Sequence, residues 1–285
     1  MSTLVFGAGF LGRRFARELP LATLSTVDIT DRDAVAAAIR GARAEVVINA
    51  AGKTGRPNVD WCETHRGPTW RSNVLGALEL AEACEAAGAH LVHVGSGCVF
   101  YGPSPSPGGW REDDPANPIS YYSRSKYAAD LLLAPLPHVA VVRIRMPVDA
   151  AVHPRNLITK LAGYAQVVDV ENSVTVVDDL VGVVAALAAR RASGVFHATN
   201  PGTLRHRDLL ALYRQVVDPS HRCELIGEGE LVARGLAAAP RSNCVLASPR
   251  LDGLGLAMRP VGVALADVMS RYAADLRARA HQPGA

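Results

Sequence analysis

Short apolar runs alternate with amphipathic segments through the first half of the chain. The apolar runs predict buried strands at residues 3–6, 21–27, 45–49, 90–95 and 139–144. Helical spacing separates them, at residues 10–19, 31–39, 73–87 and 122–133. Strands that alternate with helices in this way predict an α/β fold, a doubly wound parallel sheet of the Rossmann type with helices on both faces.

The pattern becomes less regular after residue 146. Helices are predicted at residues 157–163, 178–190, 207–217 and 261–277, and strands near 174–177 and 194–198. We therefore expect residues 1–146 to form the Rossmann domain, with residues 178–198 returning to it. Residues 147–279 are expected to form mainly a smaller, mixed substrate-binding lobe, and residues 280–285 a flexible tail.

Composition and charge exclude several classes of protein. The chain has 285 residues, of which 49% are hydrophobic and 20% charged, and its net charge is only +3 without a basic stripe, so no nucleic acid is expected. No apolar run approaches the ~20 residues that span a bilayer, and no signal peptide is apparent, so we expect a cytoplasmic protein away from membranes. The five cysteines are scattered without a C-x-x-C pair, which favours free thiols and no metal site.

A glycine-rich turn follows the first predicted strand and opens a helix. Gly7 permits a tight turn, Gly9 lets a diphosphate approach the backbone, and Gly12 lets the helix pack on the strand. Phe10 and Leu11 lie between them at the helix start, where amide hydrogens attract phosphates. The turn predicts a dinucleotide site, and the alternative is a glycine-rich turn without a ligand.

The choice between NADPH and NADH stays open at this point. Asp28 follows the second predicted strand, where an acidic residue would bind the ribose 2′-OH of NAD. Asp31 is equally compatible with the cap of the next helix, and Arg32 is available for the 2′-phosphate of NADP. We favour NADPH because reductive enzymes usually use it.

A run of small residues ends the third predicted strand. It consists of Asn49, Ala50, Ala51 and Gly52. Small side chains there would let the nicotinamide half of a cofactor lie against the backbone, although close packing explains the run equally well.

Tyr122 and Lys126 lie four residues apart in a predicted helix, with Ser96 upstream at the end of an apolar run. They share one face of the helix, so the ammonium is expected to lower the pKa of the phenol. Tyr122 would then exchange a proton with a carbonyl oxygen, which Ser96 would also hydrogen-bond, while Lys126 also holds the nicotinamide ribose. Tyr121 is a rival, but only Tyr122 has Lys at the +4 position. The alternative is a surface Tyr and Lys on an amphipathic helix.

Several segments resemble the extended short-chain dehydrogenases/reductases, and within them the dTDP-4-dehydrorhamnose reductase family. They are NAAGKTGRPNVDWCETH (49–65), VGSGCVF (94–100), YYSRSK (121–126), RIRMP (143–147), PRNLITK (154–160) and APRSN (239–243). The chain is most similar to the 3,5-epimerase/4-reductase branch found in plant nucleotide-rhamnose synthases. The resemblance implies NAD(P)H-dependent conversion of a nucleotide-linked 4-keto-6-deoxyglucose to the L-rhamnose form or a related deoxysugar.

The resemblance also implies roles for further residues. Cys98 and Lys160 match the acid/base pair that epimerises C3 and C5 in the bifunctional branch. Taken alone, a Cys after a strand is usually a small core residue, and a Lys on an amphipathic helix is usually solvated. Other matched positions are expected to lie at the substrate or to support the catalytic group: Thr54, Val59, Asp60, Asn73, Asn156 and Arg241.

The resemblance carries expectations about partners and leaves alternatives. The plant proteins carry a fused 4,6-dehydratase, so a separate dehydratase would have to supply the keto sugar here. A homodimer through the helices at 73–87 and 122–133 is possible. One alternative is a pure 4-keto reductase or epimerase of another nucleotide sugar. The other is a non-catalytic NADP-binding regulatory subunit, because the regulatory subunit of methionine adenosyltransferase resembles the same family.

Overall fold

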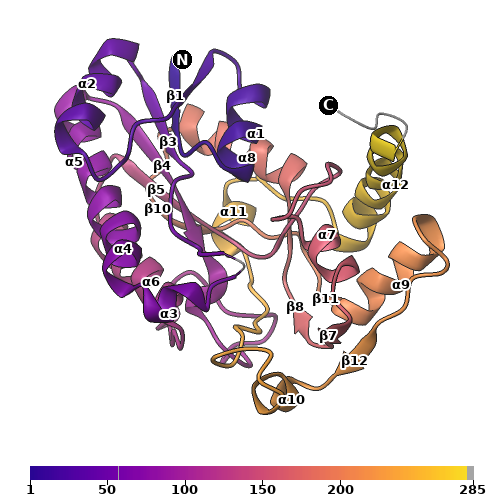
Figure 1. Ribbon diagram of the computed structural model, residues 1–285. Coiled ribbons are helices and arrows are strands. Elements are labelled where there is room, and N and C mark those ends of the chain that lie inside the picture. Colours follow the sequence, from indigo (N-terminus) through magenta and orange to yellow (C-terminus); the bar gives the residue numbers. More distant parts are fainter. Residues whose placement is uncertain (57, 281–285) are drawn as a thin grey trace.

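Six parallel strands form the central sheet of the computed structural model, which describes residues 1–56 and 58–280 (Figure 1). Their order across the sheet is β10-β5-β4-β3-β1-β2. Their bounds are β1 Thr3–Phe6, β2 Ala22–Ser25, β3 Val46–Asn49, β4 His90–Ser96, β5 Val139–Ile144 and β10 Gly194–His197. The chain reverses its direction across the sheet between β1 and β3, and ligands of such sheets bind beyond the strand ends at this point. The predicted fold class is confirmed.

Helices cover both faces of this sheet. One face carries α1 (Phe10–Glu18), α8 (Val177–Ala189) and α11 (Pro249–Gly253), and the other carries α2 (Arg32–Ala42), α5 (Gly76–Ala87) and α6 (Tyr121–Leu133). Successive strand residues point to opposite faces, so Val5 and Ile48 enter one apolar core while Phe6 and Val47 enter the other. This is why continuous apolar runs, rather than alternating ones, form these strands.

The connections at the carboxyl ends of β3 and β4 carry short helices that the sequence pattern did not predict. After β3 come α3 (Trp61–Thr64), α4 (Arg66–Trp70) and a π-helical turn, η1 (Arg71–Leu75), which leads into α5. After β4 comes a 3-10 turn, η2 (Gly97–Val99), followed by the long loop that leads to α6. Both connections therefore stand at the edge of the sheet where a ligand is expected.

A second lobe packs beyond this edge and has an apolar core of its own. Its elements are β6 (Pro147–Val148), α7 (Leu157–Ala162), β7 (Gln166–Val168), β8 (Glu171–Asn172), β9 (Thr175–Val176), β11 (Leu204–Arg205), α9 (His206–Val216), β12 (Glu224–Ile226), α10 (Glu228–Ala233) and α12 (Val261–Ala280). The strands pair only two by two, as β6-β9, β8-β11 and β7-β12. Helices α7, α9 and α12 supply most of the core, through residues such as Ile158, Leu209 and Val268.

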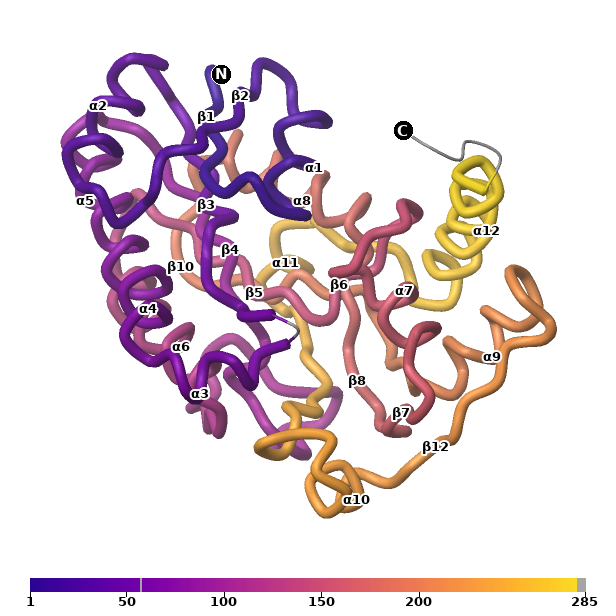
Figure 2. The backbone as a smooth tube through the Cα atoms, viewed as in Figure 1, coloured from indigo at the N-terminus to yellow at the C-terminus, as the bar shows by residue number. Residues whose placement is uncertain are grey.

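The chain passes between the two lobes more often than the sequence pattern suggested. Strand β10 and helix α8 belong to the central sheet and its cover. Helix α11 also returns to the sheet, where Leu251 and Met258 join the core beside β10 (Figure 2). Of the predicted tail, Ala280 ends α12, and residues 281–285 lie outside the described part of the chain.

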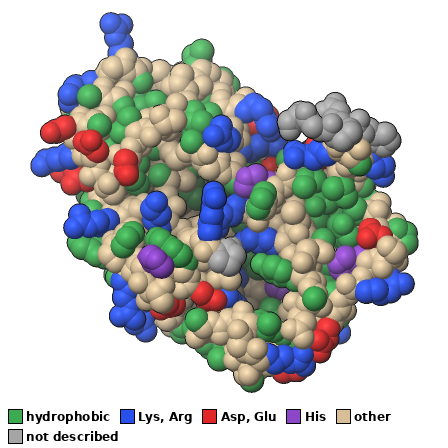
Figure 3. Space-filling view, in the orientation of Figure 1, with side chains coloured by type: hydrophobic (Ala, Val, Ile, Leu, Met, Phe, Trp, Pro, Cys, Tyr) green, Lys and Arg blue, Asp and Glu red, His purple; other side chains and the backbone are tan. Residues whose placement is uncertain are grey.

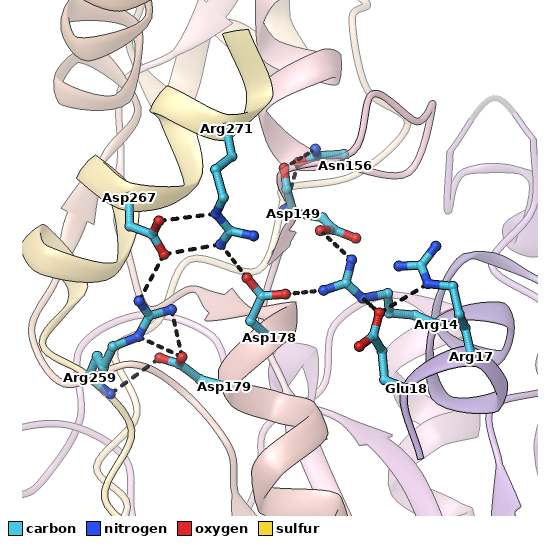
Figure 4. Close-up of polar contacts among 10 residues, drawn as sticks. All are labelled: Arg14, Arg17, Glu18, Asp149, Asn156, Asp178, Asp179, Arg259, Asp267 and Arg271. Carbon is cyan, nitrogen blue, oxygen red and sulfur yellow. Dashed lines mark hydrogen bonds and ion pairs between the residues drawn. The ribbon is translucent and has the colours of Figure 1, made fainter. Parts of the chain in front are cut away.

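A network of ion pairs ties the helix after the glycine-rich turn to the second lobe (Figure 4). Arg14 of α1 contacts Asp149, which follows β6, and Asp178 of α8. Arg271 of α12 contacts Asp178 as well. The network continues through Asp179, Arg259 and Asp267. The pairs of Arg259 and Arg271 are partly exposed, so each contributes at most about 1 kcal/mol. Asp149 is buried, and its ion pair with Arg14 joins α1 to the segment after β6.

Candidate active site

The glycine-rich turn has the geometry of a diphosphate cradle. Gly7 has a φ of 98°, and a Cβ there would lie 2.4 Å from the backbone nitrogen of Ala51. A Cβ on Gly12 would lie 1.8 Å from the Gly7 carbonyl oxygen. Gly9 is exposed, has open space where a Cβ would stand, and begins α1 without a capping side chain. The free amides of this helix end fit the diphosphate of a dinucleotide.

The second lobe reaches over this turn. The Phe10 ring stacks on the ring of His153, with their centroids 4.6 Å apart and an angle of 13° between the rings. His153 belongs to the segment between β6 and α7. Leu11 instead packs against the core of the sheet. Of the predicted cofactor residues at the turn, Gly9 offers free backbone amides to a ligand, whereas Phe10 contacts the second lobe.

No carboxylate stands directly at the end of β2, whose last residue is Ser25. Asp28 lies three residues further on and accepts hydrogen bonds from the backbone and hydroxyl of Thr30, which lower its pKa. Asp31 caps α2, as the alternative interpretation held. Arg32 is paired with glutamates of α5. The predicted role of Asp28 at the cofactor ribose stays a prediction.

The small residues after β3 fit closely behind the glycine-rich turn. The Ala50 side chain lies 3.5 Å from the position of a Cβ on Gly12. Asn49, however, is fully buried, and its Oδ1 accepts a hydrogen bond from the Ala51 backbone at 3.0 Å. Its side chain points into the protein, so this geometry favours an internal role for Asn49 over the predicted direct contact with a cofactor. Gly52 is exposed.

Ser96, Tyr122 and Lys126 come together at the carboxyl end of β4. Ser96 is the last residue of β4, and Tyr122 and Lys126 lie in the first two turns of α6, which Ser120 caps. The Ser96 hydroxyl hydrogen-bonds the Tyr122 phenol and accepts a hydrogen bond from the Cys98 amide at 3.2 Å. Lys126 is buried, and its Nζ donates to the Val94 carbonyl at 2.9 Å. These contacts suit a proton donor whose partners are held in place.

The protonation states differ from the prediction. Burial raises the pKa of the Tyr122 phenol, although its hydrogen bond with Ser96 acts in the opposite direction. Burial lowers the pKa of Lys126 to about 8, against the influence of Asp130. The expectation that the pKa of Tyr122 falls is therefore wrong, because burial raises it. A phenol that keeps its proton near neutral pH is a suitable acid for a ketone oxygen.

Cys98 and Lys160 approach one another from opposite lobes. Cys98 lies in η2, while Lys160 is half-buried on α7 and close enough to Cys98 to interact with it electrostatically. Burial lowers the pKa of Lys160, and the nearby cations Arg155 and Arg241 lower it further. Cys98 also interacts electrostatically with Tyr122. Cys98 thus lies within electrostatic range of both Tyr122 and Lys160.

Arg145 holds Cys98 in place, which the sequence alone did not indicate. Its Nη1 donates to Cys98 Sγ at 2.8 Å, and its Nη2 donates to the Ser242 carbonyl at 2.8 Å and to Asn172 Oδ1. Its side chain is only 1% exposed. A Cβ on Gly97 would lie 2.7 Å from Arg145 Cδ, so a larger residue directly before Cys98 would displace the arginine. The arginine links the Cys98 turn to the second lobe.

Two of the predicted substrate residues pair with one another. Arg241 donates to both carboxylate oxygens of Asp60, at 2.5 and 2.7 Å. The pair joins the segment after β3 to the segment before α11. Thr54 and Val59 lie half-buried in the former segment. Both side chains of the pair are partly exposed. Arg241 could therefore bind a ligand if it also kept, or gave up, its contact with Asp60.

The two predicted asparagines are used inside the protein. Asn73, in η1, accepts from the Lys53 backbone amide at 2.7 Å and donates to the Lys53 carbonyl and to Ser125 Oγ. It therefore supports α6 rather than a substrate. Asn156 is fully buried, caps α7 and donates to the carbonyls of Asp149 and Ala151. Its geometry favours a structural role over the predicted contact with a substrate.

The chain has only three lysines, and two of them occupy this site. They are Lys53, Lys126 and Lys160. Lys53 is exposed on the connection after β3, and its backbone is held by Asn73. Figure 3 shows this face of the molecule, where Lys and Arg side chains gather around the hollow between the two lobes. Such a basic hollow fits an anionic ligand.

Comparison with known proteins identifies the family of this chain. Residues 1–219 match the family described as the RmlD substrate binding domain. The chain belongs to this family. It is 37% identical to the Arabidopsis thaliana bifunctional dTDP-4-dehydrorhamnose 3,5-epimerase/dTDP-4-dehydrorhamnose reductase, over 85% of this chain and 82% of that protein. The predicted resemblance to the dTDP-4-dehydrorhamnose reductase family is thereby confirmed, and with it the oxidoreductase class.

Two further relatives of this RmlD-family chain bear on its function. A trifunctional UDP-glucose 4,6-dehydratase/UDP-4-keto-6-deoxy-D-glucose 3,5-epimerase/UDP-4-keto-L-rhamnose-reductase of Arabidopsis thaliana is 35% identical over 86% of this chain, but the match spans only 37% of that protein. The crystal structure of the L780 UDP-rhamnose synthase from Acanthamoeba polyphaga mimivirus is 27% identical, with a TM-score of 0.88, and the match covers 94% of this chain and 98% of that one.

Two further features concern the described residues as a whole. No helix among residues 1–56 and 58–280 is both long and apolar enough to cross a membrane. Within the same ranges, the acidic, His and Cys side chains form no group of three or more that could hold a metal ion. All five cysteines are free thiols.

Proposed function

We propose that the protein is an NAD(P)H-dependent nucleotide-sugar 3,5-epimerase/4-keto reductase. It converts a nucleotide-linked 4-keto-6-deoxyglucose to the L-rhamnose form or a related deoxysugar. One observation carries this proposal: Cys98 lies close enough to interact electrostatically with Tyr122 on one side and with Lys160 on the other. Residues suited to proton exchange and to ketone reduction are therefore gathered around Cys98. The names of the bifunctional plant relative and of the viral UDP-rhamnose synthase support the same chemistry.

Reduction requires a proton for the C4 oxygen of the sugar. A bound nicotinamide cofactor supplies the hydride to C4. Tyr122 donates its phenolic proton to the oxygen, and the raised pKa of the phenol keeps that proton available near neutral pH. Ser96 hydrogen-bonds the same oxygen and stabilises the charge that develops there. The glycine-rich turn and the end of α1 hold the diphosphate of the cofactor.

Epimerisation uses the same ketone in another way. The protons on C3 and C5 are acidic because the adjacent C4 carbonyl can carry the charge of an enolate. Tyr122 and Ser96 are placed to hydrogen-bond that oxygen, while Cys98 and Lys160 remove and return the protons. The lowered pKa of Lys160 lets its amine accept a proton closer to neutral pH than an ordinary lysine would. Reduction then follows on the epimerised sugar.

The cofactor is NADPH or NADH, and the geometry favours NADPH. A carboxylate directly at the end of β2 would favour NAD by binding its 2′-OH, and Ser25 stands there instead. Asp28 is accessible but bonded to Thr30. Comparing the dissociation constants of NADPH and NADH by fluorescence titration tests this preference.

The substrate must come from a dehydratase that creates the 4-keto group. The chain spans about a third of the trifunctional plant relative, whose name includes that dehydratase activity. A separate 4,6-dehydratase therefore remains the proposed upstream partner. A homodimer and a cytoplasmic location also remain predictions.

The proposal is tested by supplying NADPH and enzymatically made UDP- or dTDP-4-keto-6-deoxyglucose in D2O. We expect loss of NADPH absorbance and an L-rhamnosyl product that carries deuterium at C3 and C5. Reduction without deuterium would instead indicate a pure 4-keto reductase. Tight NADPH binding without turnover of either sugar would overturn the proposal and favour another keto substrate or a cofactor-binding subunit.

A further inference from the structure

The segment between β6 and α7, residues 149–155, contacts both sides of the expected cofactor site. On one side, the His153 ring stacks on Phe10, the first residue of α1 after the glycine-rich turn. On the other side, Arg155 Nη2 donates to the carbonyl of Gly55, after β3, at 2.7 Å. This bridging segment of the second lobe therefore reaches from the turn after β1 to the connection after β3, between which a dinucleotide is expected.

The second lobe holds the bridging segment in a fixed shape. Asn156, which is fully buried, donates to the carbonyls of Asp149 and Ala151 at 2.6 and 2.9 Å (Figure 4 shows its contact with Asp149). The Val152 amide donates to Asp275 of α12 at 2.7 Å. Because the backbone on both sides of His153 is fastened in this way, its ring is presented to the first lobe in a set position.

The protonation of His153 follows from one fixed donor. The backbone amide of Arg155 donates to His153 Nδ1 at 3.0 Å, so Nδ1 carries the lone pair. Burial lowers the pKa of His153, and the charge of Arg155 lowers it further, against the influence of Asp149. The ring is therefore neutral near neutral pH and has its proton on Nε2. Among residues 1–56 and 58–280, no group accepts a hydrogen bond from Nε2.

We propose that His153 is a cofactor-binding residue of the second lobe, which donates a hydrogen bond from Nε2 to the diphosphate of the bound dinucleotide. Its ring lies 4.6 Å from that of Phe10 and almost parallel to it, at 13°. Phe10 begins the helix whose free amides fit the same diphosphate. A phosphate oxygen is a strong acceptor for such an N–H group. The proposal rests on the dinucleotide site of the proposed function but not on its sugar.

The charged groups around His153 favour an anion beside it. Asp149 is paired with Arg14 at 3.2 Å. Arg279 lies close enough to lower the pKa of His153, and it is paired with a carboxylate of its own helix. Arg155, in contrast, is paired with no carboxylate in the described part of the chain. Its positive charge is therefore available to a diphosphate at this place.

Two substitutions separate the hydrogen bond from the ring contact. His153→Phe removes the donor but keeps a ring that can stack on Phe10. The affinity for NADPH, measured by fluorescence titration without any sugar, should fall by about ten-fold or more, because hydrogen bonds to charged groups are among the stronger ones. His153→Asn should regain part of this affinity, since its oxygen can accept from the Arg155 amide and its NH2 group can donate.

The matched control is His221→Phe. His221 is also half-buried in the second lobe, but its Nε2 lies 3.1 Å from the Ala162 carbonyl at the end of α7, and its ring meets the edge of Tyr213 in α9. This variant changes the lobe without touching α1, so it should bind NADPH as the native protein does.

Two further measurements locate the contact. 2′-Phospho-ADP-ribose keeps the diphosphate but lacks the nicotinamide, and His153→Phe should weaken its binding by the same factor as that of NADPH. Two-bond nitrogen–proton spectra of histidine-labelled native protein, assigned by His153→Asn, should show an Nε2-protonated ring whose signals shift when NADPH binds. The titration midpoint of His153 should then move to higher pH, because a neighbouring anion favours the imidazolium form.

Several results would overturn the proposal. Unchanged NADPH affinity in His153→Phe, or His153 signals that do not respond to NADPH, would leave the residue as a contact between the lobes only. An equal loss in His221→Phe would trace the effect to the stability of the lobe. A loss for NADPH but not for 2′-phospho-ADP-ribose would place the contact at the nicotinamide. If His153→Phe does not fold, the spectra of the native protein decide. No sugar is present, so inactivity on 4-keto sugars would refute the proposed function alone.

Discussion

The two groups of acid/base residues are held in different ways. Ser96, Tyr122 and Lys126 come from β4 and α6, two neighbouring elements of one sheet domain, and their polar partners lie inside that domain. Cys98 and Lys160 come from opposite lobes, and Arg145 ties the first of them to the second lobe. The proposed reductive group is therefore held within the sheet domain, whereas the proposed epimerising pair depends on the relative placement of the two lobes.

The largest effect is expected from Tyr122→Phe. It removes the proton donor but keeps the ring, so reduction should fall by about 10²- to 10⁴-fold. Proton exchange at C3 and C5 should fall less, because Ser96 still hydrogen-bonds the C4 oxygen. Steady-state loss of NADPH and deuterium exchange measured on one preparation compare the two activities. Equal losses in both would mean that the two groups do not act separately.

A smaller and more selective loss is expected from Lys160→Met. Removing this amine should slow deuterium exchange by about 10²-fold, while reduction of a sugar that is already epimerised stays within a few-fold of the native rate. Lys160→Arg is the matched control, since it keeps the positive charge but cannot exchange a proton near neutral pH. Exchange at the native rate in the Arg variant would show that only the charge matters.

Gly97→Ala is expected to disturb Cys98 indirectly, by displacing Arg145, which holds it. The added methyl group would lie 2.5 Å from Leu246 Cδ1 and 2.7 Å from Arg145 Cδ, so the arginine must shift away from Cys98. We expect a loss of about 1–3 kcal/mol in the free energy of unfolding. Deuterium exchange should suffer more than reduction, because the shifted Arg145 loses its hydrogen bond to Cys98 Sγ. A loss of reduction alone would contradict the comparison.

The smallest effect is expected from Asp60→Asn, which weakens the contact with Arg241 between the lobes. Both side chains are about a quarter exposed, so the loss of unfolding free energy should be about 1 kcal/mol or less. Urea denaturation measures it, with Glu224→Gln in the exposed Arg234 pair as a control that should change nothing measurable. A lower KM for the nucleotide sugar in Asp60→Asn would indicate that Arg241, once released, binds the substrate.

The regular part of the fold could be predicted because its physical causes are local. A run such as Val46–Asn49 suits only a strand covered on both faces, and the φ of Gly7 shows why that position requires glycine. The second lobe gave weaker signals. Its strands β6, β8, β9 and β11 are two residues long, too short for any periodicity to appear.

The site was predictable where spacing determines proximity, as for Tyr122 and Lys126 on one helix face. The contacts of Asn49, Asn156 and Arg145 depend on residues far away in the sequence, so their side-chain types alone did not reveal their partners. His93 was missed altogether. It lies in strand β4, which is buried throughout, and its Nε2 is 3.0 Å from Lys126 Nζ. It follows Leu91 by two residues and so shares the face that α6 covers. A polar residue at such a position was the available signal.

The most direct test of the central claim compares the native protein with Cys98→Ser. Both are given NADPH in D2O, first with a 4-keto-6-deoxyglucose nucleotide and then with the same sugar already epimerised at C3 and C5. We predict that Cys98→Ser loses deuterium incorporation and turnover of the first sugar but reduces the second at close to the native rate. Undiminished deuterium incorporation in Cys98→Ser, or equal loss with both sugars, would contradict the account of two chemistries at one site.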